Sequence, residues 1–376
     1  MKVYGGFMYY YKTFYKPTRE VQIQYTVDML YQGVVPASIY NYNTPPEKIT
    51  IRKESKETFS INQPIYNALI NVLEQVNDEL DYSYTDYRIP KSSGGFRTIS
   101  APNEQLKTLQ RTVVNLLERL NATAHDAAYA YTAQRTCKDA IIKHQRAENN
   151  WFYKFDIKDF FPSCTVSVLK NNLKFIYPFC CLPNTALDKI IKLATRNGAL
   201  PQGSPLSPLL SNVLLMPFDF MMTFSMRPFK GVYTRYADDI IISTAHKHQL
   251  DFIQRIIKSH LKEISPDLKI NTEKSRCGSI KGSNWNLGLM LNADNNITIG
   301  HKKKMELKAK INNFIFDFTN RNYWSIIDTQ VLQGELNYFK TIEPEYAAFV
   351  IQRLEQKHNT TRTLAEMFSD IISGRV

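Results

Sequence analysis

Two adjacent aspartates between two apolar β runs constrain the fold of this chain more than any other feature. They lie in the segment Val232-Tyr-Thr-Arg-Tyr-Ala-Asp-Asp-Ile-Ile-Ile-Ser243. Runs rich in Val, Ile, Thr and Tyr favour strands, so the segment predicts a β-hairpin with Tyr236-Ala-Asp-Asp239 at its tip. Taken alone, an Asp-Asp pair in a hairpin is more typical of a solvated turn. The strength of the flanking strands, however, indicates that Asp238 and Asp239 lie at the edge of a buried sheet.

A second acidic segment reads Phe152-Tyr-Lys-Phe-Asp-Ile-Lys-Asp-Phe-Phe161. We expect an apolar strand that carries Asp156 and runs into Asp159 and a pair of phenylalanines. If Asp156 lies on a strand beside the hairpin, three carboxylates converge, and their repulsion requires a divalent cation. Two magnesium ions held in this way can activate a 3′-hydroxyl and stabilise a leaving pyrophosphate. The two segments together therefore predict nucleotidyl-transfer chemistry.

A segment rich in glycine, proline and serine lies between these two. It reads Leu200-Pro-Gln-Gly-Ser-Pro-Leu-Ser-Pro-Leu-Leu-Ser-Asn212 and is expected to be a loop that opens a helix reaching Met216. Small residues and a free helix N-terminus allow a nucleotide to approach the backbone closely. An ordinary loop and helix cap is the alternative interpretation of this segment alone.

Composition narrows the class of protein. The chain has 376 residues, of which 43% are hydrophobic and 22% charged, which is enough for a folded core. This excludes a disordered chain, a collagen-like repeat and a small disulfide-stapled scaffold. The 47 Lys and Arg exceed the 35 Asp and Glu, a formal net charge of +12. The excess favours a polyanionic partner, but charge alone does not separate nucleic acid from a membrane surface or plain solubility.

Cysteine usage and apolar runs indicate an intracellular protein. The five cysteines form no Cys-x-x-Cys pair and no zinc pattern, so we expect reduced thiols. The N-terminus contains no apolar run like that of a signal peptide. The most apolar long segment, Leu209–Met226, contains Asn212, Pro217 and Asp219, which makes a membrane span costly. We expect a cytoplasmic protein without a membrane partner.

The order of expected elements indicates an α+β fold. Residues 1–60 form a Tyr-rich extension, whose tyrosines suit packing as well as stacking on single-stranded bases. Helical spacing begins at Asn62 and returns over residues 104–120, and residues 87–102 indicate strand, glycine turn and strand. The middle of the chain alternates short strands with helices, and the tail after Gly300 is mainly helical.

These residues together resemble the reverse transcriptases. Residues 89–102 resemble the fingers motif, residues 155–161 the first palm motif, and residues 200–208 and 236–239 the next two. Residues 268–274 and 287–291 are similar to the later palm and primer-grip elements, in the family's order and spacing from about residue 62 to 350. The resemblance implies a right-hand polymerase with fingers at 61–150, an antiparallel palm sheet backed by helices at 151–290, and a helical thumb at 291–376.

The resemblance also implies roles for particular residues. Asp156, Asp238 and Asp239 would be the catalytic carboxylates, holding two Mg²⁺ ions for which Mn²⁺ can substitute. The remaining residues of the expected site concern the nucleotide. Lys91 and Arg97 would contact the triphosphate, Phe161 would be the steric gate against a ribose 2′-hydroxyl, Gln202 and Gly203 would line the pocket, and Lys274 would protonate the leaving pyrophosphate. Solvated turn charges are the alternative interpretation of these lysines and of Arg97.

A lysine-rich helix is expected from His301 onward. At the thumb its cations would grip the phosphate backbone of an RNA/DNA duplex and give salt-sensitive affinity. A solvated helix face is the alternative interpretation. The lysines are Lys302, Lys303, Lys304, Lys308 and Lys310.

The lineage within the family depends on three further segments. Residues 332–346 look like the thumb of the retron and group II intron branch. Retron enzymes carry Asn-Ala-x-x-His before the first palm motif, where residues 139–144 here read Asp-Ala-Ile-Ile-Lys-His, and Val-Thr-Gly near the primer grip, where residues 286–288 read Asn-Leu-Gly. A retron-like or phage-defence enzyme fits best, and a group II intron-derived enzyme without maturase or endonuclease domains is the alternative.

The expected activity is RNA-directed DNA polymerisation from dNTP substrates on an RNA template. A cognate non-coding RNA and an effector protein are further expected partners, and the primer is an RNA 2′-hydroxyl, a 3′-hydroxyl or a protein hydroxyl. Two other classes stay open at this point. An RNA-dependent RNA polymerase shares the palm carboxylates, although Phe161 argues against it, and a non-catalytic RNA-binding scaffold would not need three intact aspartates.

Overall fold

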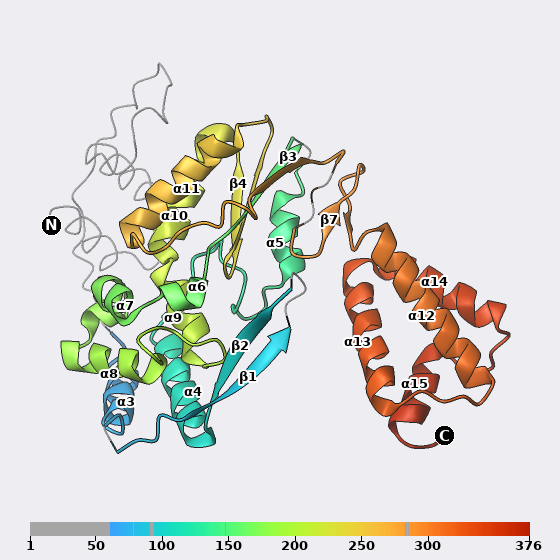
Figure 1. The fold of residues 1–376 in the computed structure, drawn as a ribbon, viewed down its shortest axis with the longest axis horizontal. Coiled ribbons are helices and arrows are strands. Elements are labelled where there is room, and N and C mark those ends of the chain that lie inside the picture. Colours follow the sequence, from blue (N-terminus) through green and yellow to red (C-terminus); the bar gives the residue numbers. More distant parts are fainter. Residues whose placement is uncertain (1–60, 78, 91–93, 147, 283, 285) are drawn as a thin grey trace. The chain divides into compact units, whose positions relative to one another are not determined.

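The computed structural model describes residues 61–77, 79–90, 94–146, 148–282, 284 and 286–376 (Figure 1). The Tyr-rich extension of residues 1–60 and Lys91 lie outside the described residues. The described chain divides into two compact units. The first comprises the residues up to Thr136 together with Tyr153–Arg276, and the second comprises Cys137–Phe152 together with Cys277–Val376. The limits given above for fingers, palm and thumb stay a prediction.

The first unit opens with a helix and an antiparallel hairpin. Helix α3 (Gln63–Leu73) precedes strands β1 (Tyr84–Pro90) and β2 (Phe96–Pro102), which pair from Tyr84 with Pro102 to Pro90 with Phe96. Helix α4 (Glu104–Arg119) follows, capped by the Asn103 side chain, which accepts a hydrogen bond from the Leu106 N–H. The predicted helices and the two paired strands between them are confirmed, and residues 91–93 of the predicted turn lie outside the described residues.

The largest sheet among the described residues has four strands (Figure 1). Its order is β4-β5-β3-β6, formed by β4 (Val232–Tyr236), β5 (Asp239–Thr244), β3 (Trp151–Asp156) and β6 (Arg276–Ser279). Strands β4 and β5 are antiparallel and end in the pair of Tyr236 with Asp239, which confirms the predicted hairpin. Three successive isoleucines of β5, residues 240–242, are completely buried.

Helices support this sheet and the loops around it. Helix α10 (Met216–Ser225) packs against β4, and α11 (Leu250–Ile264) packs against α10. Helix α9 (Leu206–Leu214) contacts α4, α7 (Val166–Leu173) and α10, while α8 (Asn184–Ala194) contacts α3, α4 and α7. Between β3 and α7 lies the short helix α6 (Phe160–Ser163). This order of strands and helices is the α+β arrangement that the sequence predicts.

The second unit is mainly helical, as predicted for the tail. It contains α5 (Cys137–His144), a two-stranded sheet of β7 (Met290–Leu291) and β8 (Ile297–Thr298), and four longer helices. These are α12 (His301–Thr319), α13 (Ile326–Ile342), α14 (Pro344–Lys357) and α15 (Leu364–Ile372). Their core includes Phe314, whose ring lies 4.8 Å from that of Phe368 and 5.3 Å from that of Trp324.

Among the described residues, no single helix is long and apolar enough to cross a membrane. Residues Leu206–Leu214 and Met216–Phe229 meet the length and composition requirement only as a pair, bent by 43° between them. The cysteines Cys137, Cys164, Cys180, Cys181 and Cys277 are all free thiols, as predicted.

Candidate active site

The hairpin tip is a two-residue turn that carries the first catalytic candidate. Ala237 and Asp238 connect β4 to β5, and Ala237 adopts a left-handed conformation with φ +56°. The Asp238 carbonyl accepts a hydrogen bond of 2.9 Å from the Ile157 N–H. Because Ile157 directly follows Asp156, this bond joins the end of β3 to the hairpin tip. The structure therefore brings Asp156 close to Asp238 and Asp239, as the sequence predicts.

The three carboxylates influence one another electrostatically. Burial of the Asp238 carboxyl raises its pKa, and the negative charges of Asp239 and Asp156 raise the pKa further. Lys274 and a backbone hydrogen bond oppose the shift. Charged carboxylates are therefore held together here at an electrostatic cost, which a bound cation would relieve.

Two lysines lie against the outer members of this cluster. The Nζ of Lys274 is 3.3 Å from Asp156 Oδ2, and the Nζ of Lys154 is 2.9 Å from Asp239 Oδ1. Lys274 is predicted from the sequence, whereas Lys154 is not. The sequence contains a signal for Lys154, because it precedes Asp156 by two positions and residues two apart on a strand lie on the same face of the sheet.

The cluster fits a hard divalent cation in its chemistry. Carboxylate oxygens are the ligands that Mg²⁺ and Mn²⁺ prefer, and Asp238 is crowded by like charge. The arrangement is not that of a preformed cage, since within the described ranges no group of three or more His, Cys, Asp or Glu side chains is placed to hold a metal ion. The ammonium groups of Lys154 and Lys274 neutralise two of the three carboxylates.

The loop between the two acidic segments is bound to the β1–β2 hairpin. The Ser100 N–H on β2 donates to the Gln202 carbonyl at 2.6 Å. Gly203 has φ +116°, and a Cβ placed on it would lie 2.6 Å from the Ser100 carbonyl oxygen. Only glycine permits this approach, so Gln202 and Gly203 are fixed beside the strand that carries Arg97.

Phe161 lies in a small aromatic group. It belongs to α6, which begins after Asp159, a residue with a left-handed φ of +45°. Its ring centroid lies 5.4 Å from that of Phe160 and 6.3 Å from that of Tyr131. Phe160 is buried, and Phe161 is partly exposed. A partly exposed ring just after the strand that carries Asp156 suits the predicted gate.

Tyr131 is a further residue of this site and is not predicted from the sequence. Partial burial of its hydroxyl raises its pKa, the charge of Asp238 raises it further, and Arg97 lowers it. Tyr131 thus shares an environment with Phe161, Asp238 and Arg97. The surrounding sequence, Ala127-Ala-Tyr-Ala-Tyr131, has neither helical nor strand periodicity and offered no signal of this role.

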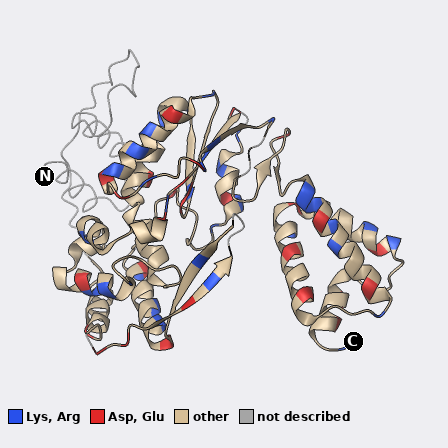
Figure 2. Cartoon of the chain, viewed as in Figure 1, with Lys and Arg blue, Asp and Glu red and all other residues tan. Residues whose placement is uncertain are grey.

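The predicted thumb lysines lie on α12 of the second unit, where Figure 2 shows Lys and Arg at the start of the helix. Two of these lysines form ion pairs within the unit. Lys304 forms an ion pair with Glu343 and lies 4.6 Å from the ring centroid of Tyr346, and Lys310 lies 2.7 Å from Glu335. Lys302 is exposed and lies 3.9 Å from Glu306. Lys303 is exposed and Lys308 is partly exposed.

Comparison with known proteins identifies the family. Residues 89–307 match the family described as "Reverse transcriptase (RNA-dependent DNA polymerase)". The chain is 30% identical over 272 residues to the Retron Ec73 reverse transcriptase of Escherichia coli, covering 69% of this chain and 83% of that protein. It is 28% identical over 290 residues to the Retron Ec83 reverse transcriptase of Escherichia coli, covering 73% of this chain and 86% of that protein.

The chain therefore belongs to the reverse transcriptase family. It is an RNA-directed DNA polymerase with a right-hand polymerase fold, and its similarity to retron enzymes places it in the retron and group II intron branch. The predicted resemblance, fold and enzyme class are confirmed, and neither an RNA-dependent RNA polymerase nor a non-catalytic scaffold is favoured. Members of this family copy RNA and use divalent metal ions.

Proposed function

We propose that Asp156, Asp238 and Asp239 hold two Mg²⁺ ions, or Mn²⁺ in their place, and that these residues carry the polymerase reaction. Such ions, when bound, activate the primer 3′-hydroxyl and neutralise charge on the leaving pyrophosphate. The observation that carries this proposal is the hydrogen bond from the Ile157 N–H to the Asp238 carbonyl, because it ties the two carboxylate-bearing elements together. The raised pKa of Asp238 supports it.

On the nucleotide side, the triphosphate is bound by Arg97 and Lys91, the latter outside the described residues. A guanidinium suits this role because it donates charge-assisted hydrogen bonds to phosphate oxygens. Gln202 and Gly203 line the pocket of the incoming dNTP. The hydrogen bond between Ser100 and Gln202 supports this assignment, since it holds the loop against the strand that carries Arg97.

Lys274 protonates the leaving pyrophosphate. Its ammonium lies 3.3 Å from Asp156 Oδ2 and is more than half exposed, so it is at the edge of the carboxylate cluster and can reach a ligand there. A lysine ammonium can donate a proton to a phosphate oxygen as the P–O bond breaks, and then regain it from water.

Replacement of both Asp238 and Asp239 by Asn tests the carboxylates. Primer extension on poly(rA)/oligo(dT) should be abolished, because amides are poor ligands for the ions and carry no charge. RNA affinity should stay roughly intact, since neither residue is expected to contact the template backbone. Full activity in the double variant would contradict the proposed mechanism.

Phe161 excludes ribonucleotides by contact with the 2′-hydroxyl. A Phe161→Ala variant should therefore incorporate ribonucleotides, with a shift in discrimination of about 10²-fold. Phe161→Tyr is the matched control, because it keeps the ring and should keep the preference for dNTPs. If the Ala variant still rejects ribonucleotides like the parent, Phe161 is not the gate.

We further infer a cytoplasmic retron-like role in phage defence, with a cognate non-coding RNA as template and an effector protein as partner. The support is the similarity to proteins named retron reverse transcriptases. The exposed lysines of α12 would bind the phosphate backbone of the RNA/DNA duplex, which makes affinity fall steeply with salt. Sequencing the nucleic acid that copurifies with the protein tests the inference, and finding no tightly or covalently bound DNA would contradict it.

A further inference from the structure

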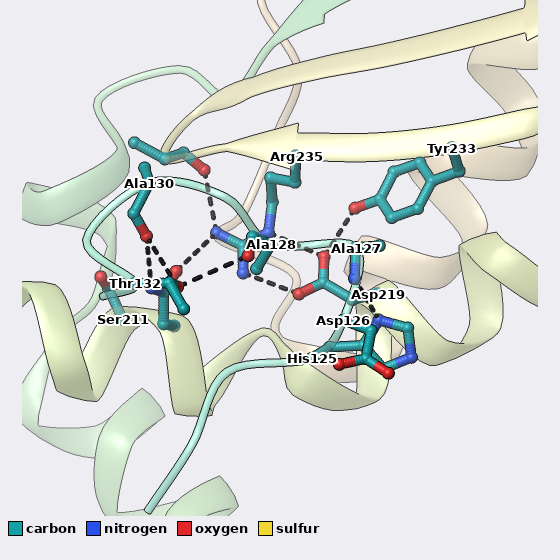
Figure 3. Close-up of polar contacts among 12 residues, drawn as sticks. His125, Asp126, Ala127, Ala128, Ala130, Thr132, Ser211, Asp219, Tyr233 and Arg235 are labelled. Carbon is teal, nitrogen blue, oxygen red and sulfur yellow. Dashed lines mark hydrogen bonds and ion pairs between the residues drawn. The ribbon is translucent and has the colours of Figure 1, made fainter. Parts of the chain in front are cut away.

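A completely buried ion pair lies beside the hairpin tip (Figure 3). Arg235 is the residue of β4 that precedes Tyr236, and Asp219 belongs to α10. The two side chains form two parallel hydrogen bonds, Nε to Oδ1 and Nη2 to Oδ2, each 2.7 Å long, and both are fully inaccessible to solvent. This forked geometry uses only part of the guanidinium, which has further donors.

The remaining donors of the guanidinium reach the catalytic turn. Arg235 Nη1 donates to the Ala237 carbonyl at 3.0 Å and to Asn212 Oδ1 at 3.1 Å. Ala237 is the residue before Asp238, and its left-handed φ of +56° is a conformation that an alanine adopts rarely. A buried donor on its carbonyl favours this conformation over the alternatives, so Arg235 fixes the direction in which the chain enters Asp238.

The same residue organises the segment that leads to Tyr131. The backbone of Arg235 forms a parallel β-bridge with this segment. The Arg235 N–H donates to the Ala127 carbonyl at 2.7 Å, and the Tyr129 N–H donates to the Arg235 carbonyl at 2.8 Å. Asn212, which accepts from the guanidinium, donates from Nδ2 to the Ala130 carbonyl at 2.8 Å. Figure 3 shows this segment passing beside the ion pair.

The Asp219 carboxylate also accepts a hydrogen bond from a neutral side chain. The Tyr233 hydroxyl donates to Asp219 Oδ1 at 2.6 Å. Burial, together with the charge of Asp219, raises the pKa of Tyr233 well above its usual value, so the hydroxyl keeps its proton and acts as donor. The group of Arg235, Asp219, Tyr233 and Asn212 is therefore a connected polar network.

Stability alone is a poor reason for this network. Removing two charges from water is costly, and well-packed apolar residues of similar volume often replace a buried ion pair without loss of stability. What apolar residues cannot supply is a donor to the Ala237 carbonyl. A lysine cannot supply it either while also meeting both oxygens of Asp219, because an ammonium lacks the planar fork.

We propose that Arg235 is a positioning residue: it holds the turn of Ala237 and Asp238 so that the carboxylates of Asp238 and Asp239 stay beside that of Asp156, and it thereby sets the catalytic rate rather than substrate affinity. This inference rests on the proposed function, in which those aspartates carry the reaction. Arg235 does not touch the reacting atoms, and its effect passes through the backbone of the turn.

The test removes the ion pair and the tyrosine hydroxyl of the network together and keeps Asn212. The triple variant Arg235→Met, Asp219→Leu, Tyr233→Phe leaves no unpaired buried charge or hydroxyl from these three residues. We expect a thermal midpoint close to that of the parent, a dNTP KM and an RNA Kd within about threefold of it, and a kcat lowered roughly 10²-fold. A folded triple variant with parental kcat overturns the proposal.

Two further variants keep the result decisive. Arg235→Lys preserves a positive charge for Asp219 and should still lower kcat more than KM. It therefore decides the question if the triple variant does not fold. Parental kcat in Arg235→Lys overturns the proposal. Ser225→Ala is the matched control, because it breaks another buried hydrogen bond of the same unit, the 2.8 Å contact with His260. It should lower the thermal midpoint and leave kcat unchanged.

The parallel assay of the Asp238→Asn, Asp239→Asn variant separates this inference from the one on which it rests. If that variant stays active, the proposed carboxylate mechanism fails. If it is inactive while the triple variant keeps parental kcat, only the role of Arg235 fails.

Discussion

The first unit contains two antiparallel hairpins that differ in how they are held. In the β4–β5 hairpin, most side chains from Tyr233 to Thr244 are buried, and the carboxylates appear only at its tip. In the β1–β2 hairpin most side chains are exposed, and Arg97 is among them. The β4–β5 hairpin carries its carboxylates at the end of a buried base, whereas the β1–β2 hairpin carries its basic side chains on exposed strands.

Their polar supports differ in the same way. Arg235 and Asp219 are fully buried beside the tip of the first hairpin. The second is supported at its base, where Arg196 pairs with Asp86 and donates to Ser100 Oγ at 2.9 Å, and the side chains of Arg196 and Asp86 are partly exposed. Arg196, and then Ser100, lower the pKa of Asp86 by hydrogen bonding to its charged form.

This difference matches the role that we propose for each hairpin. Metal-binding carboxylates require one geometry, which buried and fully satisfied contacts enforce. Basic side chains that bind a triphosphate must extend into solvent and be accessible to the ligand, and an exposed hairpin with few buried contacts allows this. The contrast leads to four predictions.

The largest expected effect is that of Asp238→Asn. Activity should fall by about 10³-fold or more, since a charged ligand is lost. The thermal midpoint should stay equal or rise, because burial and neighbouring carboxylates already disfavour the charged form, as the raised pKa shows.

The matched control is Asp86→Asn at the base of the other hairpin. There the pKa is lowered, so the charge stabilises the fold, and the same substitution should lower the thermal midpoint and leave kcat intact. Thermal melts and primer extension measure both variants. A lower midpoint in Asp238→Asn would remove the contrast between the hairpins.

Arg97→Ala should raise the dNTP KM by about 10- to 100-fold, the loss expected for a charge-assisted contact with phosphate. Its thermal midpoint should not change, because the side chain is exposed. Arg88→Ala is the control: Arg88 is also exposed, and since Arg88 pairs with Thr98 while Arg97 pairs with Ile89, it lies on the opposite face. Equal effects of the two substitutions would show that general charge, not the position of Arg97, binds the nucleotide.

Lys154→Met should lower the Mg²⁺ concentration that gives half-maximal activity by a few-fold. The ammonium of Lys154 lies 2.9 Å from Asp239 Oδ1 and competes with a cation for that oxygen. Lys170→Met, which breaks the exposed pair of Lys170 with Asp188, makes the same change of charge elsewhere and should have no effect on the metal requirement. Metal titrations followed by thermal shift, without substrate, provide a readout independent of activity, and an unchanged midpoint concentration in Lys154→Met contradicts the competition.

The smallest effect concerns pH. Burial lowers the pKa of His260, which packs α11 against α10 behind β4, to about 4. The unfolded chain binds a proton near pH 6.5 and the folded chain does not, so stability is present above that pH and falls on acidification towards pH 4, by about 1.4 kcal/mol per unit.

His260→Gln should flatten this dependence, measured by denaturant unfolding between pH 7 and about 4.5. The support of the β1–β2 hairpin should not respond in this window, because the lowered pKa of Asp86 keeps its carboxylate charged. A wild-type curve without slope over the same range would contradict the role of His260.

Local sequence patterns were enough to identify much of this molecule. Apolar spacing located α4, glycine and β-branched residues located β1 and β2, and the two apolar runs located β4 and β5. These predictions hold because the signals act between neighbours in the chain, through periodicity and turn chemistry. The aspartates were recognised because carboxylates at the ends of apolar strands are unusual.

Contacts between distant residues were not accessible in this way. Asp219 was noted only as a charge that interrupts an apolar segment, and Lys154 and Tyr131 were not noted at all. Each acquires its role from a partner on another element: Arg235 for Asp219, Asp239 for Lys154, and Phe161 for Tyr131. No periodicity links such pairs, because packing of whole elements decides which side chains meet.

The amino-acid sequence was thus sufficient to indicate the class of chemistry, since three aspartates in this order and setting suit nucleotidyl transfer. How those aspartates are held depends on contacts between elements that are distant in the chain. A hydrogen bond from Arg235 to the Ala237 carbonyl exists because α9, α10 and the segment of residues 127–130 close around β4 and exclude water. In that dry environment a buried polar group needs a hydrogen-bond partner, and Arg235 finds one in the turn that carries the proposed catalytic carboxylates.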